Sequence, residues 1–123
     1  MPRDIPVGNG SLLVAFDADY TIRDLYYPRV GKENHALGNP CRFGVWTREG
    51  YSWINAREWK LALGYMKETL VTNVRAFHER LGLQLTCNDV VDFEKNIYMR
   101  KVTVRNLKSN EREVRLFFHQ DLS

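Results

Sequence analysis

The feature that most constrains the fold of this chain is a strict alternation of apolar and polar residues over positions 83–88, which read LQLTCN. Successive side chains of a β-strand point to opposite faces of the sheet, so this spacing predicts a strand with one buried and one solvated face. Residues 113–118, which read EVRLFF, alternate in a similar way. Half-buried strands of this kind are typical of antiparallel sheets.

Turn-forming residues separate the apolar segments at short intervals, which predicts a series of β-hairpins. The strands that we expect cover residues 11–16, 20–26, 43–47, 51–54, 70–77, 83–87, 97–107 and 112–118. We expect them to pair in that order as four hairpins. Only residues 55–63 suggest a short helix, capped by Asn55, and a strand leading into the next hairpin is nearly as well supported there. Several strands with at most one short helix predict an all-β protein, folded as an antiparallel β-sandwich.

Length and composition fit one soluble domain. The chain has 123 residues, 44% of them apolar, which is enough for a sizeable core. No stretch approaches the length of a membrane span, and no apolar region marks a signal peptide, so we expect a cytoplasmic protein with no membrane partner. In that compartment Cys41 and Cys87 are expected to be thiols rather than a disulfide.

The charge of the chain says little about its partners. Lys and Arg total 18 against 15 for Asp and Glu, which leaves a net charge of +3. These charges are spread along the sequence, whereas a nucleic-acid surface usually gathers them. We therefore expect no nucleic-acid partner, and a small basic nucleic-acid module remains only a minor alternative.

None of the usual catalytic or metal-binding signatures is complete. His78-Glu79 starts like a zinc-protease motif, but no second histidine follows at the required spacing. Carboxylate pairs such as Asp89 with Asp92 could be imagined in glycoside hydrolysis, yet such pairs arise by chance in a chain with 15 acids. The sequence therefore predicts no catalytic residue, no metal site and no cofactor.

The segment from Tyr26 to Gly38 is the sharpest local feature. It belongs to a long irregular stretch, and loops longer than about 12 residues are uncommon unless they are functional. Aromatic, cationic, acidic, amide and imidazole groups are concentrated in it, as in a polar binding surface. The alternative is an ordered loop whose polar groups satisfy each other. Our candidates for contact with a substrate or another domain are Tyr27, Arg29, Glu33, Asn34 and His35.

Three tryptophans form the second candidate. Trp46 and Trp53 could stack on sugar rings, and Trp59 could join them. Packing in the core or at a domain interface is the commoner use of tryptophan.

Several motifs, in order along nearly the whole chain, resemble the amino-terminal domain of prokaryotic glucoamylase-like and glucodextranase-like enzymes of glycoside hydrolase family 15. Any one of them is weak, whereas the ordered set is fairly specific. The motifs are Ile5 to Leu13, Asp17 to Asp24, Leu25 to His35, Glu68 to Thr72, Asp89 to Asp92, Asn96 to Arg100, Arg105 to Leu107 and Glu113 to Asp121.

This resemblance implies a β-supersandwich that precedes a helical (α/α)6 barrel. In that family the barrel supplies both carboxylates for inverting hydrolysis of α-glucosidic bonds, and 123 residues leave no room for it. The resemblance therefore implies a non-catalytic domain over residues 1–123, a fragment of a larger glycoside hydrolase. Its implied partners are the helical catalytic domain of the same polypeptide and an α-glucan or related oligosaccharide.

Two alternatives stay open beside this hypothesis. The first is a stand-alone carbohydrate-binding module that stacks sugars on Trp46, Trp53 or Tyr51. The second is a sugar-modifying enzyme, such as an epimerase, which would need a histidine and a carboxylate converging in one cleft. If the sandwich is incomplete, its open edge predicts self-association of the isolated chain, with a homo-oligomer as one outcome.

Overall fold

The computed structural model describes residues 3–31, 33–67 and 69–120, and within them it contains ten β-strands and no helix. Lys32, Glu68 and Asp121, which belong to the motifs of the resemblance, lie outside the described residues. The strands are β1 (Ile5–Gly8), β2 (Leu13–Phe16), β3 (Ile22–Tyr26), β4 (Arg42–Thr47), β5 (Gly50–Trp53), β6 (Trp59–Ala62), β7 (Val74–His78), β8 (Leu83–Val91), β9 (Tyr98–Asn106) and β10 (Arg115–His119).

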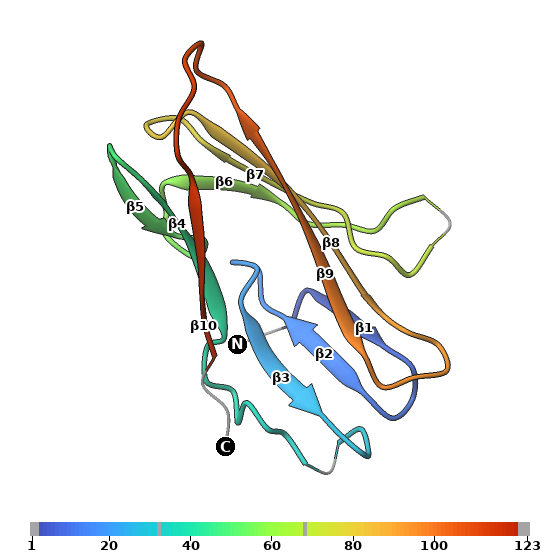
Figure 1. Ribbon diagram of the computed structural model, residues 1–123. Helices are drawn as coiled ribbons and strands as arrows, with labels where there is room; N and C mark the ends of the chain where they lie inside the picture. Colours follow the sequence, from blue (N-terminus) through green and yellow to red (C-terminus); the bar gives the residue numbers. More distant parts are fainter. Residues whose placement is uncertain (1–2, 32, 68, 121–123) are drawn as a thin grey trace.

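These strands form three antiparallel sheets that pack as a sandwich, which confirms the all-β prediction (Figure 1). Their orders are β1-β2-β3, β10-β4-β5 and β6-β7-β8-β9. A bridge between Ile22 and Cys41 connects the first two sheets at the start of β4. Among the described residues no helix is long and apolar enough to cross a membrane.

One apolar core lies between the inner faces of the sheets. Every second residue of β8, from Leu83 to Val91, is buried, as the alternation predicts. Phe16 and Val14 of β2 and Phe43 of β4 are fully buried in the same cluster. The strands therefore have one buried and one solvated face, as the sequence indicates, and the buried faces of all three sheets form one core.

Local side-chain bonds explain the tight turn between β2 and β3. The carboxylate of Asp17 accepts hydrogen bonds from the backbone N–H groups of Asp19, at 2.9 Å, and Thr21, at 3.1 Å. Between them Tyr20 has a φ of 58°, a left-handed conformation that a residue other than glycine adopts only when its surroundings impose it. The turn directs the Tyr20 ring into the core, stacked 5.1 Å from the ring of Phe16.

Two expectations about the strands are wrong. Residues 55–63 contain β6 rather than a helix, so the strand alternative holds there. The last two strands do not form a hairpin: β9 pairs with β8, whereas β10 crosses to the other sheet and pairs with β4. Alternation indicates that a segment is a strand, but it does not indicate which strand pairs with it. The prediction assigned each strand to its neighbour in the sequence. The short strand β1 was not expected either.

Both cysteines are buried thiols, as predicted. Cys87 lies in β8, where its side chain continues the buried face of that strand. Burial raises the pKa of the Cys87 thiol to about 11, so it is protonated and behaves as a small apolar side chain.

A buried carboxylate, that of Asp89 on β8, connects several elements of the core. One of its oxygens accepts hydrogen bonds from the hydroxyls of Tyr20 and Thr72, the latter at 2.9 Å. The other accepts from the hydroxyl of Tyr98 and from Nε of Arg100, the latter at 2.8 Å. Burial raises the pKa values of both tyrosines, so each hydroxyl remains protonated and can donate. Asp89 thus has a cation and three hydroxyl partners, which a charge in the core requires.

We predict that Asp89→Ala strongly destabilises the fold. It leaves the Arg100 guanidinium in the core without its carboxylate, and breaking a buried ion pair in this way costs about 3–5 kcal/mol. The free energy of unfolding, measured by urea denaturation, checks this. Asp19→Ala is the control, because Asp19 is exposed in the β2–β3 turn and its loss should change stability by less than about 0.5 kcal/mol. Equal stabilities of the two variants would contradict the assigned role of Asp89.

Candidate functional site

The outer face of the β10-β4-β5 sheet gathers aromatic side chains from all three strands. Strand pairing places Trp46 of β4 opposite Tyr51 of β5. One row further, Trp53 of β5 and Phe117 of β10 both lie opposite Gly44. We call Trp46, Tyr51, Trp53 and Phe117 the aromatic face. Tyr51 is 63% exposed and the other three are half-buried, so the face is open to solvent.

Gly44 sits at the centre of the aromatic face, and the absence of a side chain there is what lets the rings meet. A Cβ atom at this position would lie 2.4 Å from the ring of Phe117 and 3.0 Å from the backbone oxygen of Ser52. The rings of Phe117 and Trp53 instead close over the glycine, 4.8 Å apart and edge to face. That arrangement is the one aromatic pairs favour.

Arginine side chains lie against both tryptophans of this face. The Arg42 guanidinium lies 4.0 Å from the centre of the Trp53 ring, and that of Arg115 lies 5.0 Å from the Trp46 ring. Glu113 accepts a hydrogen bond from Arg115 at 2.7 Å. Each cation is attracted to the ring electrons and holds the ring in place. The face therefore combines aromatic rings with guanidinium groups that lie over two of them, so it offers both apolar surface and N–H donors, the groups that contact the apolar and hydroxyl parts of a sugar.

The structure thus brings together two of the predicted tryptophans with Tyr51. Trp59 is separate, since it is buried and donates its indole N–H to the Ser52 hydroxyl at 3.0 Å. Sequence reasoning missed Phe117, because it placed β10 beside β9 rather than beside β4. Within β10 the side chains alternate, since Phe117 packs against Trp53 on the aromatic face, whereas the next residue, Phe118, has its ring 5.7 Å from that of buried Phe43.

The predicted loop from Tyr26 to Gly38 is held largely by Asn34. Its side-chain oxygen accepts hydrogen bonds from the backbone N–H groups of Leu25 and Ala36, at 3.0 and 3.1 Å. Its amide donates to the Asp24 carboxylate at 2.8 Å. Asn34 therefore holds the loop in shape. This agrees with the alternative interpretation of the sequence, in which the polar groups of the loop bond to each other rather than to a ligand.

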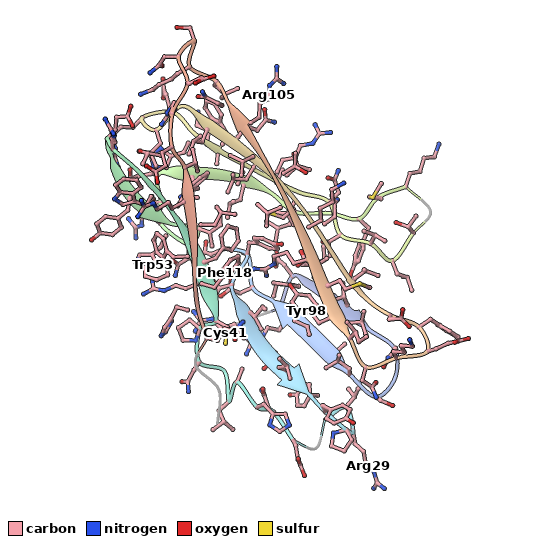
Figure 2. The ribbon with its side chains drawn as sticks, in the orientation of Figure 1. Arg29, Cys41, Trp53, Tyr98, Arg105 and Phe118 are labelled. Carbon is pink, nitrogen blue, oxygen red and sulfur yellow. The ribbon has the colours of Figure 1, made fainter. Side chains whose placement is uncertain are left out.

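The other four candidates of the loop differ in exposure. Nε2 of His35 lies 2.9 Å from the backbone oxygen of Tyr27 and 4.0 Å from a carboxylate oxygen of Glu33. Tyr27, Arg29 and Glu33 are exposed. Figure 2 places Arg29 at the end of the molecule away from Trp53. The loop and the aromatic face are therefore two separate surfaces.

A histidine and a carboxylate do converge elsewhere, at a shallow hollow lined by Glu58, His78, Glu79 and Arg80. Nε2 of His78 lies 3.0 Å from a Glu58 oxygen, which also pairs with Arg80 at 3.0 Å. Nδ1 of His78 accepts a hydrogen bond from the Leu81 N–H at 3.1 Å. Nδ1 is occupied by the Leu81 N–H, Nε2 has Glu58 as its near neighbour, and the ring is 1% exposed, so this pair lies against the β7–β8 turn rather than presenting an accessible base.

Many carboxylates of the chain are held by cations. The ion pairs that involve arginine or lysine join Asp17 with Arg23, Asp24 with Arg3, Asp89 with Arg100, Glu49 with Lys108 and Arg112, Glu58 with Arg80, and Glu113 with Arg115. Across residues 3–31, 33–67 and 69–120, no group of three or more His, Cys, Asp or Glu side chains gathers as metal ligands would. Asp89 and Asp92, imagined as a pair in the sequence, have separate structural tasks: Asp92 accepts hydrogen bonds from the backbone of the β8–β9 turn.

Comparison with known proteins gives one informative similarity. No protein-family model matches the chain, and no solved structure matches it. A protein of Methanocaldococcus jannaschii, named as an uncharacterized glycosyl hydrolase, is 28% identical to the chain over 116 residues. This match covers 94% of the chain and 18% of the relative. The chain therefore spans less than a fifth of the length of the relative that it matches.

The buried ring of His78 makes fold stability depend on pH. Burial lowers the pKa of His78 below its ordinary value of 6.5, and this effect outweighs the attraction of Glu58. As pH falls through 6.5, the unfolded chain takes up a proton that the folded chain resists, so the free energy of unfolding decreases. We predict that His78→Gln flattens this decrease between about pH 7 and pH 5, where histidine is the side chain that ordinarily titrates.

Urea denaturation across this pH range measures the slope for each variant. His119→Gln is the control, since His119 is exposed at the end of β10 and should leave the slope unchanged. If His78→Gln showed the same dependence of the free energy of unfolding on pH as the wild-type chain, another group would be its cause.

Proposed function

We propose that this chain is a non-catalytic β-sandwich module of a glycoside hydrolase related to family 15, and that its aromatic face contacts an α-glucan or a related oligosaccharide. The geometry that carries the proposal is the cluster of Trp46, Tyr51, Trp53 and Phe117 around Gly44. The similarity to a protein named as a glycosyl hydrolase supports the choice of ligand class. The ordered motifs that resemble family 15 support the same choice.

The aromatic face suits a sugar because Tyr51 is exposed and the three half-buried rings beside it are held in place. Exposed aromatic groups bury a large apolar area on binding and lose little conformational freedom. The Arg42 and Arg115 guanidinium groups beside the rings carry N–H donors that can bond sugar hydroxyls. A stand-alone carbohydrate-binding module would use the same face, so the two versions of the proposal differ only in whether a catalytic domain is joined to it.

In this proposal the chemistry of hydrolysis lies outside the chain. Glycoside hydrolysis needs two carboxyl groups that flank the scissile bond, one of them free to donate a proton. Here Asp17, Asp24 and Asp89 are buried and paired with arginines. The helical catalytic domain that the resemblance implies would supply both carboxyl groups. The exposed loop residues Tyr27 and Arg29 would pack on that domain or line its cleft.

We predict that Tyr51→Ala weakens binding of maltoheptaose roughly three- to tenfold, as expected when one aromatic stacking partner is removed. Binding is measured by tryptophan fluorescence, because Trp46 and Trp53 lie on the same face and report on its occupancy. Tyr51 is 63% exposed, so its removal should leave the core unchanged.

Phe93→Ala is the matched control, because Phe93 is 89% exposed in the β8–β9 turn, outside the aromatic face. Absence of a fluorescence change with the wild-type chain, or equal weakening in the two variants, would contradict sugar binding at this face.

We also propose that the isolated chain self-associates along β9. This nine-residue strand lies at the edge of its sheet, with β8 as its neighbour there, so one row of backbone groups has no strand partner in the sheet. Apolar side chains are exposed nearby, with Val104 of β9 37% and Phe118 of β10 57% accessible. In a longer polypeptide the helical domain or a further strand would cover them.

Analytical ultracentrifugation of the chain tests this proposal. We expect a concentration-dependent shift from monomer to dimer or higher species. Thr103→Lys, in the middle of β9, should weaken the association, because charge at a strand edge disfavours edge-to-edge pairing. A monodisperse monomer at all concentrations would overturn it.

A further inference from the structure

The outer face of the β6-β7-β8-β9 sheet is basic. Strand pairing places Lys60 in the same row as Arg105, with residues of β7 and β8 between them. Arg75 occupies the next row on this face, and Lys101 the row after that. We call the outward residues of these rows the basic face; they are Lys60, Ala62, Arg75, Phe77, Gln84, Thr86, Asn88, Val90, Met99, Lys101, Thr103 and Arg105. Figure 2 shows Arg105 projecting from β9 on the side away from β10.

The four cations of the basic face are exposed, and among the described residues none of them forms an ion pair. Asp and Glu are absent from the twelve outward positions of this face. On the remaining surface of the part of the chain that the structure describes, carboxylates pair with Arg80, Lys108 and Arg112, while cations such as Arg48 and Arg57 are exposed without an ion pair but do not share one sheet face. The basic face therefore carries an uncompensated positive charge that the small net charge of the chain conceals.

Uncharged polar side chains lie between the cations. Thr86 and Thr103 are neighbours across β8 and β9, with Gln84 and Asn88 on either side of Thr86 along β8. Hydroxyl and amide groups both donate and accept hydrogen bonds, as sugar hydroxyl groups do. Asn88 uses its amide on the backbone oxygen of Thr72, at 3.0 Å. Its side-chain oxygen has no corresponding bond among the described residues.

We propose that the basic face binds an acidic polysaccharide, meaning an extended chain of sugars that carry carboxylate groups. Cations on both edge strands and on an interior strand of one sheet match charges that repeat along an extended ligand rather than one anionic group. Lys101 and Arg105, four residues apart on β9, are separated by about 13 Å along the strand. The threonine and amide side chains between the cations would bond the hydroxyl groups of the same ligand.

Nucleic acid fits this face less well. Proteins that hold single strands on a β-sheet combine cations with several aromatic rings on which bases stack. The basic face carries one aromatic ring, that of Phe77, and it is half-buried. The inference is independent of the proposed function, since it concerns a different sheet and a charged rather than a neutral ligand.

Affinity of the 123-residue chain for polygalacturonate tests the proposal, measured by isothermal titration calorimetry at low and high salt. We expect binding that weakens as salt increases, because exposed charges are screened. Arg75→Gln combined with Lys101→Gln should weaken it roughly tenfold, as expected for the loss of two exposed ionic contacts. The control is Arg48→Gln combined with Arg57→Gln, which removes the same charge from exposed positions outside the face and should leave affinity unchanged.

Three outcomes would overturn the inference. The first is that the wild-type chain does not bind polygalacturonate. The second is that the two double variants weaken binding equally, which would show that the affinity depends only on the net charge of the chain. The third is tighter binding of single-stranded DNA than of polygalacturonate at the same salt concentration, which would assign the face to nucleic acid. Dextran, a neutral polymer, measures how much affinity comes from hydroxyl groups alone.

Discussion

A buried carboxylate is stable only when cations and hydrogen-bond donors replace the water around it. Asp89 is such a carboxylate, and the segments that supply its partners must therefore be held together in the folded sandwich. Its four side-chain partners come from the β2–β3 turn, from the segment before β7 and from β9. The guanidinium of Arg100 in turn lies 4.9 Å from the Tyr20 ring and 5.2 Å from the Phe43 ring, so it contacts the sheet that contains β4 as well. Because these segments share one buried charge, all three sheets depend on the same cluster.

The two candidate binding surfaces lie on the opposite sides of sheets whose inner faces form that core. In β4, Phe43 and Val45 are buried, which leaves Trp46 to the outside. In β9, the partners of buried β8 residues face inward, which leaves Lys101 and Arg105 to the outside. One face is aromatic with arginines at its rings and the other is basic and free of acids. The sandwich thus presents two chemically different surfaces.

Much of the fold could be predicted because it follows from local patterns. The hairpins β2–β3, β4–β5 and β7–β8 join strands through short turns, so neighbours in sequence are neighbours in space. The pairing of β10 with β4 could not be predicted in this way, since it joins residues about 70 positions apart. The sequence singled out Trp46 and Trp53, which the structure places on one face, whereas Phe117 joins them only through that long-range pairing. The basic face was missed because its cations are scattered along the sequence.

The sequence by itself determined which segments are strands and which side of each strand is apolar, because successive side chains of a strand alternate between two faces. It also determined that the chain has thiols rather than a disulfide and that Asn34 lies in an irregular loop. Only the tertiary structure decided which strands pair and which side chains become neighbours across them. The physical reason is that sheet neighbours are joined by backbone hydrogen bonds that carry no residue identity, so the partner of each strand is selected by the packing of the entire core.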